Sequence, residues 1–329
     1  MSDTPYDDLS PATLLDAIEA LGLRADGSVT PLNSFENRVY QFGIEEGAPV
    51  VAKFYRPGRW SDAAIDEEHA FMQELDSAEV PCVAPLSHDG RTLFHHAGFR
   101  YAVFPREAGR TPNVEDPAVL RVLGHALGRL HAVGASRAFV HRARLSVETL
   151  GRRSVDFLVA SGFVDVELLP AYEAVARQLV ERIEPTMMDV PGIRIHGDCH
   201  LGNLLMRDDA DAPLGARPNF VDFDDTVTGP PIQDLWMLLA GDAAERSGQL
   251  RELVSAYEAF HDFDTRATRL IEPLRTLRML HHAAWIGRRW ADPAFPVAFP
   301  AFGETRYWSE HILALKEQLA ALDDPPLAI

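Results

Sequence analysis

The hydrophobic pattern of the chain changes character near residue 105. Before this point, short runs of alternating apolar and polar residues predict β-strands at residues 38–44, 50–55, 92–96 and 100–104. A helix over Thr13–Leu21 precedes these strands, and a second helix is predicted from Ser61 to about Leu75. The first third of the chain is therefore expected to be rich in strands.

After residue 105, apolar residues recur at helical spacing, which predicts helices over 118–133, 168–184, 232–244, 250–261, 270–290 and 304–322. Two short apolar runs predict strands at 192–196 and 219–223, and the Pro- and Phe-rich segment 291–302 predicts a loop. The pattern predicts an α+β chain with two lobes. The N-lobe (residues 1–104) contains a helix, an antiparallel sheet and one further helix, and the larger C-lobe (residues 105–329) is mainly helical.

Composition and charge restrict the classes of function. Of the 329 residues, 47% are hydrophobic and 24% are charged, which is typical of a folded globular protein. The net charge of −18 argues against a general nucleic-acid or anionic-membrane binder, because such proteins need a basic surface. The sequence has no run of 18 apolar residues, so no transmembrane helix is expected. Its first ten residues, MSDTPYDDLS, do not resemble a signal peptide. The two cysteines cannot form a disulfide framework. We therefore expect a cytoplasmic protein.

The stretch HGDCHLGNLL at His196–Leu205, followed by FVDFDDT at Phe220–Thr226, is the most informative part of the sequence. Asp198 and Asn203 lie five positions apart, and Asp222 follows a short apolar strand. Phosphoryl transfer needs such a set: one carboxylate deprotonates the incoming hydroxyl, while an amide oxygen and a second carboxylate hold Mg²⁺ on the phosphates.

H-G-D-x-x-x-x-N followed by D-F-D-D resembles the aminoglycoside phosphotransferase and choline kinase superfamily, and is closer still to its bacterial Ser/Thr protein kinases. The resemblance extends to NSFENRVYQF at Asn33–Phe42, VAKFYRPGRW at Val51–Trp60 and VDFDDTVTGPPIQDLWMLL at Val221–Leu239. It implies a protein-kinase-like fold, with a nucleotide-binding N-lobe and a C-lobe that carries the catalytic loop and the acceptor-binding helices. It further implies that the chain uses ATP and Mg²⁺ and takes part in a stress response.

The resemblance assigns a role to each matching position. It implies that Asp198 is the catalytic base, that Asn203 is a Mg²⁺ ligand and that Asp222 is the Mg²⁺-binding aspartate of the catalytic set. It matches Ser34 to a serine that meets the ATP phosphates and Lys53 to a lysine that pairs with them. ATP is expected between the lobes, with adenine near Val51 and the segment that begins at Phe104.

The residues around Lys53 support its role independently. The chain has two lysines, Lys53 and Lys316, among 31 basic residues. Val51 and Lys53 share one face of a strand, which places an apolar contact beside a phosphate contact. Glu68 lies on the apolar stripe of the helix that begins at Ser61, so we expect it to hold Lys53, although Glu67 is an alternative.

The turn before Val39 reads LNSFENRV and lacks the glycines of a phosphate-binding loop. Side chains of Asn33, Ser34 and Asn37 are expected to bind the phosphates instead. Zinc binding by the group His196, Cys199 and His200 is disfavoured, because no second Cys/His pair lies at ligand spacing. Arg288 and Arg289 could be a solvated face or a docking site, and these two possibilities remain open.

These features favour an ATP- and Mg²⁺-dependent kinase that phosphorylates Ser/Thr hydroxyls of proteins, including its own chain. A small-molecule kinase acting on an aminoglycoside, choline or a homoserine-like hydroxyl is an alternative, because its ATP machinery would be the same. A non-catalytic nucleotide sensor is a further alternative. The expected partners are protein substrates, without nucleic acid or membrane, and we expect a monomer.

Overall fold

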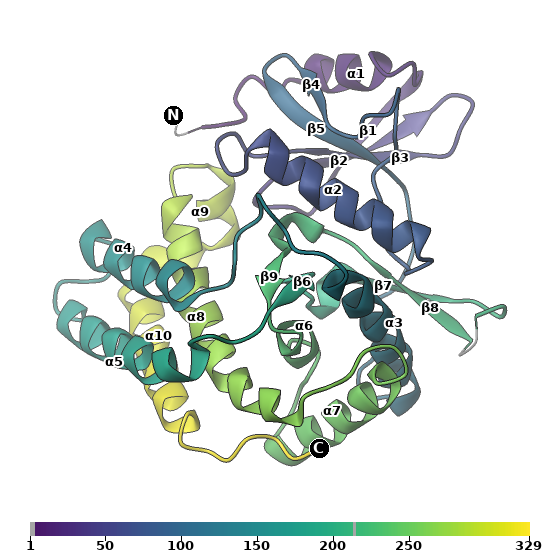
Figure 1. Cartoon of the computed structure of the whole chain (residues 1–329). Helices are drawn as coiled ribbons and strands as arrows, with labels where there is room; N and C mark the ends of the chain where they lie inside the picture. The colour runs from purple at the N-terminus through teal and green to yellow at the C-terminus, as the bar shows by residue number, and fades with distance from the viewer. Residues whose placement is uncertain (1–3, 213–214) are drawn as a thin grey trace.

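The computed structural model describes residues 4–212 and 215–329, and it has two lobes (Figure 1). The N-lobe holds a five-stranded antiparallel sheet in the order β1-β2-β3-β5-β4. Its strands are β1 (Ala25–Leu32), β2 (Arg38–Ile44), β3 (Val50–Phe54), β4 (Phe94–His96) and β5 (Phe99–Pro105). Helices α1 (Pro11–Glu19) and α2 (Asp62–Ser77) belong to the same lobe.

The two faces of the N-lobe sheet pack against different parts of the molecule. Because side chains alternate along a strand, Ala52 and Phe54 of β3 join the apolar cluster under α1, together with Leu14 and Ile18. Val51, in contrast, packs against the cluster shared by α2 and the C-lobe. Lys53 has the same parity as Val51, so the sheet directs its side chain towards the C-lobe.

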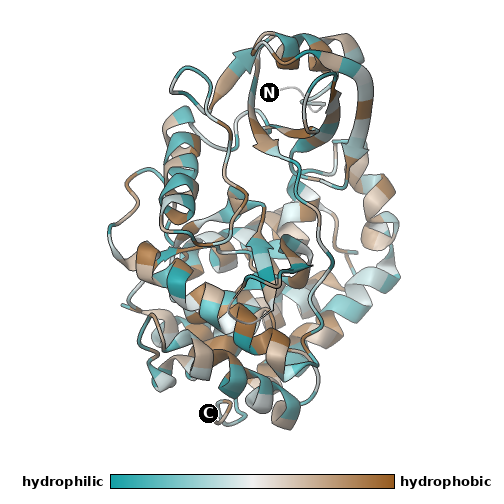
Figure 2. Ribbon diagram, turned by 90° about the vertical axis from the view of Figure 1, so that its right-hand side faces the viewer, coloured by the Kyte–Doolittle hydropathy of each residue, from teal (hydrophilic) through white to brown (hydrophobic). Residues whose placement is uncertain are grey.

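The C-lobe is mainly helical, and hydrophobic and hydrophilic bands alternate along its helices (Figure 2). Its helices are α3 (Pro117–Ala135), α4 (Arg153–Ser161), α5 (Leu169–Met187), α6 (Ile232–Trp236), α7 (Ala243–Tyr257), α8 (Ile271–Arg288), α9 (Ala294–Ala298) and α10 (Thr305–Ala321). Two small antiparallel sheets pair β6 (Ile193–Ile195) with β9 (Val227–Gly229) and β7 (Leu204–Asp208) with β8 (Ala216–Phe220). These short strands carry the segments that contain Asp198, Asn203 and Asp222.

Several element predictions were wrong. The helix predicted at 232–244 is broken, because Gly241 has a φ of +87° and Asp242 caps a new helix through a capping box with Glu245. Strand β1 was missed because its polar, Pro-containing sequence suits only an edge position. The strand predicted at 219–223 ends at Phe220 and begins earlier, and the loop predicted at 291–302 contains α9. Among the described residues, no helix is long and apolar enough to cross a membrane.

Candidate active site

A cavity of about 430 Å³ lies between the two lobes. Most of the predicted site residues line it: Ser34, Val51, Lys53, Glu68, Phe104, Asn203 and Asp222. Val51 and Phe104 are register partners on neighbouring strands and form an apolar wall. Asp198 does not line the cavity, but Asn203 donates its Nδ2–H to the Asp198 carbonyl oxygen at 3.0 Å. The structure thus brings the predicted residues together from both lobes.

Lys53 is buried among three carboxylates. Its Nζ lies 3.0 Å from Asp222 Oδ1, 3.3 Å from Asp224 Oδ1 and 3.6 Å from Glu68 Oε1. Burial alone would lower the pKa of the Lys53 amine, but the three carboxylates outweigh burial and hold this pKa well above its ordinary value. The amine therefore stays charged and provides a fixed cation in an acidic protein.

Glu67 and Glu68 have different partners, which separates the two alternatives for the lysine. Glu68 pairs with Lys53 and, through Oε2, with Arg142 Nη1 at 3.4 Å. Glu67 instead accepts hydrogen bonds from the backbone N–H groups of residues 140–142 at 2.6–2.8 Å. Glu68 therefore lies in the cavity beside Lys53, whereas Glu67 fastens α2 to a C-lobe loop.

Asp234 fixes the loop that carries Asp198 through hydrogen bonds to the loop backbone. Asp234 Oδ2 accepts from the His196 N–H at 2.8 Å, and Oδ1 accepts from the Gly197 N–H at 2.9 Å. His131 Nε2 lies 3.1 Å from Asp234 Oδ2, and its Nδ1 lies 2.9 Å from the Tyr257 hydroxyl. Asp234 is fully buried and every partner is internal, so it braces the loop.

The Asp198 side chain contacts two basic residues. Arg278 of α8 donates to Oδ1, and His200 Nε2 lies 3.5 Å from Oδ2. Burial alone would raise the pKa of the Asp198 carboxyl, but Arg278 and His200 hold it below its ordinary value. The carboxylate is thus ionised and able to accept a proton. Arg278 was missed in the sequence, because nothing in its helical pattern distinguishes it.

Asn203 and Asp222 have the atoms that a Mg²⁺ site needs. Asn203 uses its amide nitrogen on Asp198, which leaves Oδ1 for a cation, and Asp222 uses Oδ1 on Lys53, which leaves Oδ2. Asp222 adopts a left-handed backbone with a φ of +58°, an uncommon conformation that recurs at functional sites. Two oxygen ligands suit Mg²⁺, since protein Mg²⁺ sites are usually completed by water and substrate phosphates.

No cluster of three or more His, Cys, Asp or Glu side chains that could hold a metal occurs in residues 4–212 and 215–329. Asp224 and Asp225 both pair with Arg59.

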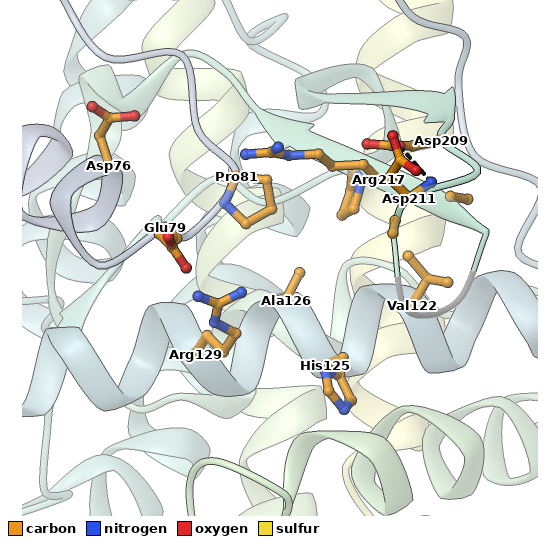
Figure 3. A pocket seen from close by; sticks show the side chains of 13 residues that line it. Asp76, Glu79, Pro81, Val122, His125, Ala126, Arg129, Asp209, Asp211 and Arg217 are labelled. Carbon is orange, nitrogen blue, oxygen red and sulfur yellow. Dashed lines mark hydrogen bonds between the residues drawn. The ribbon is translucent and has the colours of Figure 1, made fainter.

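A separate cavity of about 550 Å³ is lined by α2, α3 and the β7–β8 hairpin (Figure 3). It contains acidic and basic side chains but none of the predicted site residues.

The glycine-free loop before β2 is clamped to the C-lobe. Glu36 accepts from Trp285 Nε1 at 2.6 Å and pairs with Arg289, while Arg38 pairs with Asp292 at 2.8 Å. Asn33 and Ser34 of the loop line the cavity. Asn37 does not line it, because its side chain accepts from the backbone N–H of residue 56. Arg289, left open in the sequence, thus serves as a partner of the loop.

Comparison with known proteins agrees with this geometry. A model of the phosphotransferase enzyme family matches residues 28–271. Stress response kinase A of Escherichia coli O157:H7 is 42% identical over 330 residues, which cover 98% of this chain and 97% of that protein. Serine/threonine protein kinase RdoA of Salmonella typhimurium (strain LT2) shows the same identity and coverage.

Among solved structures, amicoumacin kinase hAmiN in complex with AMP-PNP, Ca²⁺ and Ami superposes with a TM-score of 0.70 at 17% identity, covering 94% of this chain and 93% of that one. The likeness confirms the predicted two-lobed, protein-kinase-like fold, and the sequence comparisons confirm the predicted resemblance. The chain belongs to the phosphotransferase enzyme family and, within it, is a homologue of stress response kinase A.

Proposed function

We propose that the chain is an ATP- and Mg²⁺-dependent kinase that phosphorylates Ser/Thr hydroxyls of proteins, including its own, as part of a stress response. One observation carries the proposal. Lys53, Asn203 and Asp222, from different parts of the chain, line one cavity, and Asp198 lies directly beside it. The similarity to a Ser/Thr protein kinase over 98% of the chain supports a protein acceptor.

Each residue has a role that its surroundings allow. Adenine would lie against the apolar wall of Val51 and Phe104, and Lys53, oriented by Glu68, would contact the phosphates beside Ser34. Fixed charges of this kind lower the barrier because they need no reorganisation during the reaction.

Asn203 Oδ1 and Asp222 Oδ2 would hold Mg²⁺, which when bound neutralises phosphate charge. The ionised Asp198 would accept the proton of the acceptor hydroxyl, and Asp234 would keep the loop in position for this transfer.

Incubation of the purified chain with labelled ATP, Mg²⁺ and a protein extract tests the proposal. We expect label on Ser or Thr of polypeptides, including the chain itself, and Asp198→Ala is expected to reduce the rate about 10²–10⁴-fold. Label on small molecules alone would favour the small-molecule kinase. Equal, near-zero turnover by the unmodified chain and the variant would favour a non-catalytic nucleotide sensor.

A further inference from the structure

Helix α8 brings an arginine to the Asp198 carboxylate. Arg278 and His200 contact the Asp198 carboxylate directly. Arg275 and His282 lie three residues before and four residues after Arg278, so all three share one face of the helix. Burial and the charge of Arg278 lower the pKa of His282, which favours its neutral form. An acceptor that approaches Asp198 from the side of α8 meets the charged guanidinium of Arg278, whereas burial also lowers the pKa of His200 and disfavours its cationic form.

Arg278 carries the least compensated positive charge on this face of α8. In the described part of the chain, its one ion-pair partner is Asp198, and 40% of its side-chain surface is exposed. Arg275, in contrast, pairs with Glu272 at 3.1 Å. A guanidinium has five N–H donors, so the contact with Asp198 leaves Arg278 able to bind a second anion.

Two further carboxylates of the site bind cations other than Arg278. Asp222 pairs with Lys53, and Asp225 pairs with Arg59. Both carboxylates therefore already have cationic partners on the nucleotide side. In the described part of the chain Arg278 thus pairs with no carboxylate other than Asp198, although the protein carries a net charge of −18.

We propose that this enzyme selects acceptor hydroxyls in acidic protein segments, with Arg278 as the specificity-determining residue. The inference rests on the proposed kinase function and adds the chemical class of the acceptor. An acceptor hydroxyl must come within about 3 Å of Asp198. Since residues of an extended peptide are spaced about 3.3 Å apart, a carboxylate one or two residues away reaches the guanidinium that contacts the same Asp198.

The same geometry disfavours a cationic small acceptor. An aminoglycoside or a choline-like amino alcohol would place its positive charge beside Arg278, where like charges repel. The acidic segment would bind the remaining donors of Arg278 while Arg278 stays on Asp198 Oδ1, and Asp198 Oδ2 would accept the hydroxyl proton.

Three serine peptides of equal length test the proposal, with Asp, Ala or Lys flanking the serine at the two positions on each side. Transfer from Mg²⁺-ATP is measured as kcat/KM for each peptide, and autophosphorylation is followed in parallel. We expect the Asp peptide to exceed the Lys peptide by about tenfold or more. The ratio of kcat/KM between peptides is compared, because a change in the reactivity of Asp198 affects all peptides equally and leaves this ratio unchanged.

Substitutions at Arg278 identify the residue responsible. Arg278→Gln is expected to remove the preference, and Arg278→Glu is expected to reverse it towards the Lys peptide. Arg288→Glu is the matched control, because Arg288 is an exposed arginine of the same helix that binds the Arg153 carbonyl, and it should keep the original ratio. Melting curves establish that each variant is folded. If Arg278→Glu does not fold, the peptide ratio of Arg278→Gln alone decides the test.

Two results would overturn the inference while leaving the kinase function intact. One is autophosphorylation together with equal use of the three peptides or a preference for the Lys peptide. The other is a uniform loss of kcat in both Arg278 variants with an unchanged peptide ratio, which would assign Arg278 to phosphate or to Asp198 alone. No label on any polypeptide would instead contradict the proposed function itself.

Discussion

Asp222 and Asp234 lie twelve residues apart, and the fold treats their carboxylates in opposite ways. Asp234 is fully buried, and both of its oxygens accept hydrogen bonds from the loop that carries Asp198. Asp222 has a side chain that is 51% exposed, contacts Lys53 through one oxygen and faces the cavity. A saturated carboxylate holds structure, whereas a carboxylate with an oxygen left over is available to a ligand. Substitutions at the two residues should therefore separate a loss of stability from a loss of phosphoryl transfer.

Asp234→Ala is expected to have the largest effect, and the effect is on stability. The substitution removes the acceptor for two backbone N–H groups and leaves His131 without its carboxylate, which is expected to lower the free energy of unfolding by about 3–5 kcal/mol. Chemical denaturation measures the change. Asp234→Asn retains one oxygen acceptor and should lose less. Unchanged stability in Asp234→Ala would contradict the bracing role.

Asp222→Asn is expected to reduce activity strongly and to change stability little, which is the opposite of Asp234→Ala. The loss of one negative charge from the cavity should reduce phosphoryl transfer about 10²–10³-fold. Stability should change by less than about 0.5 kcal/mol, since two carboxylates still surround Lys53. The rate is measured over a Mg²⁺ titration, with Asp225→Asn as the control that leaves the cavity lining intact. A large loss of stability without loss of rate would show that Asp222 is structural.

Glu68→Gln is expected to have an intermediate effect. The amide keeps the shape of the side chain but weakens its hold on Lys53, so we expect a roughly tenfold fall in kcat/KM for ATP. Glu67→Gln is the matched control, because Glu67 binds the backbone at residues 140–142 and should affect stability more than ATP use. Equal kinetic losses in the two variants would argue against a specific Lys53–Glu68 pair.

Asp292→Asn is expected to have the smallest effect. Asp292 is buried and pairs with Arg38 and Arg56, so its neutralisation should loosen the clamped loop and raise the KM for ATP a few-fold, or about 1 kcal/mol. Asp208→Asn provides the same substitution in an exposed pair with Arg110 and should change nothing measurable. A KM for ATP equal to that of the unmodified chain would show that the clamp does not affect nucleotide binding.

The sequence by itself determined the two-lobed fold and the chemically important part of the cavity lining, including Lys53, Asn203 and Asp222. These features depend on patterns that are local in the chain: two-residue alternation in β3, helical spacing after residue 105, and the short motif from His196 to Asn203. The alternation in β3 is sufficient to place Val51 and Lys53 on one face, which the structure turns towards the C-lobe.

Tertiary structure decided which charges face one another. Arg278 meets Asp198 across 80 residues of sequence, and Trp285 meets Glu36 across 249. Such pairs leave no periodic signal, because each depends on how two distant elements pack. The choice between Glu67 and Glu68 likewise depended on the rotation of α2 against the C-lobe, since both residues lie next to apolar positions of that helix. The contact of Arg278 with Asp198 was therefore visible only in the folded chain.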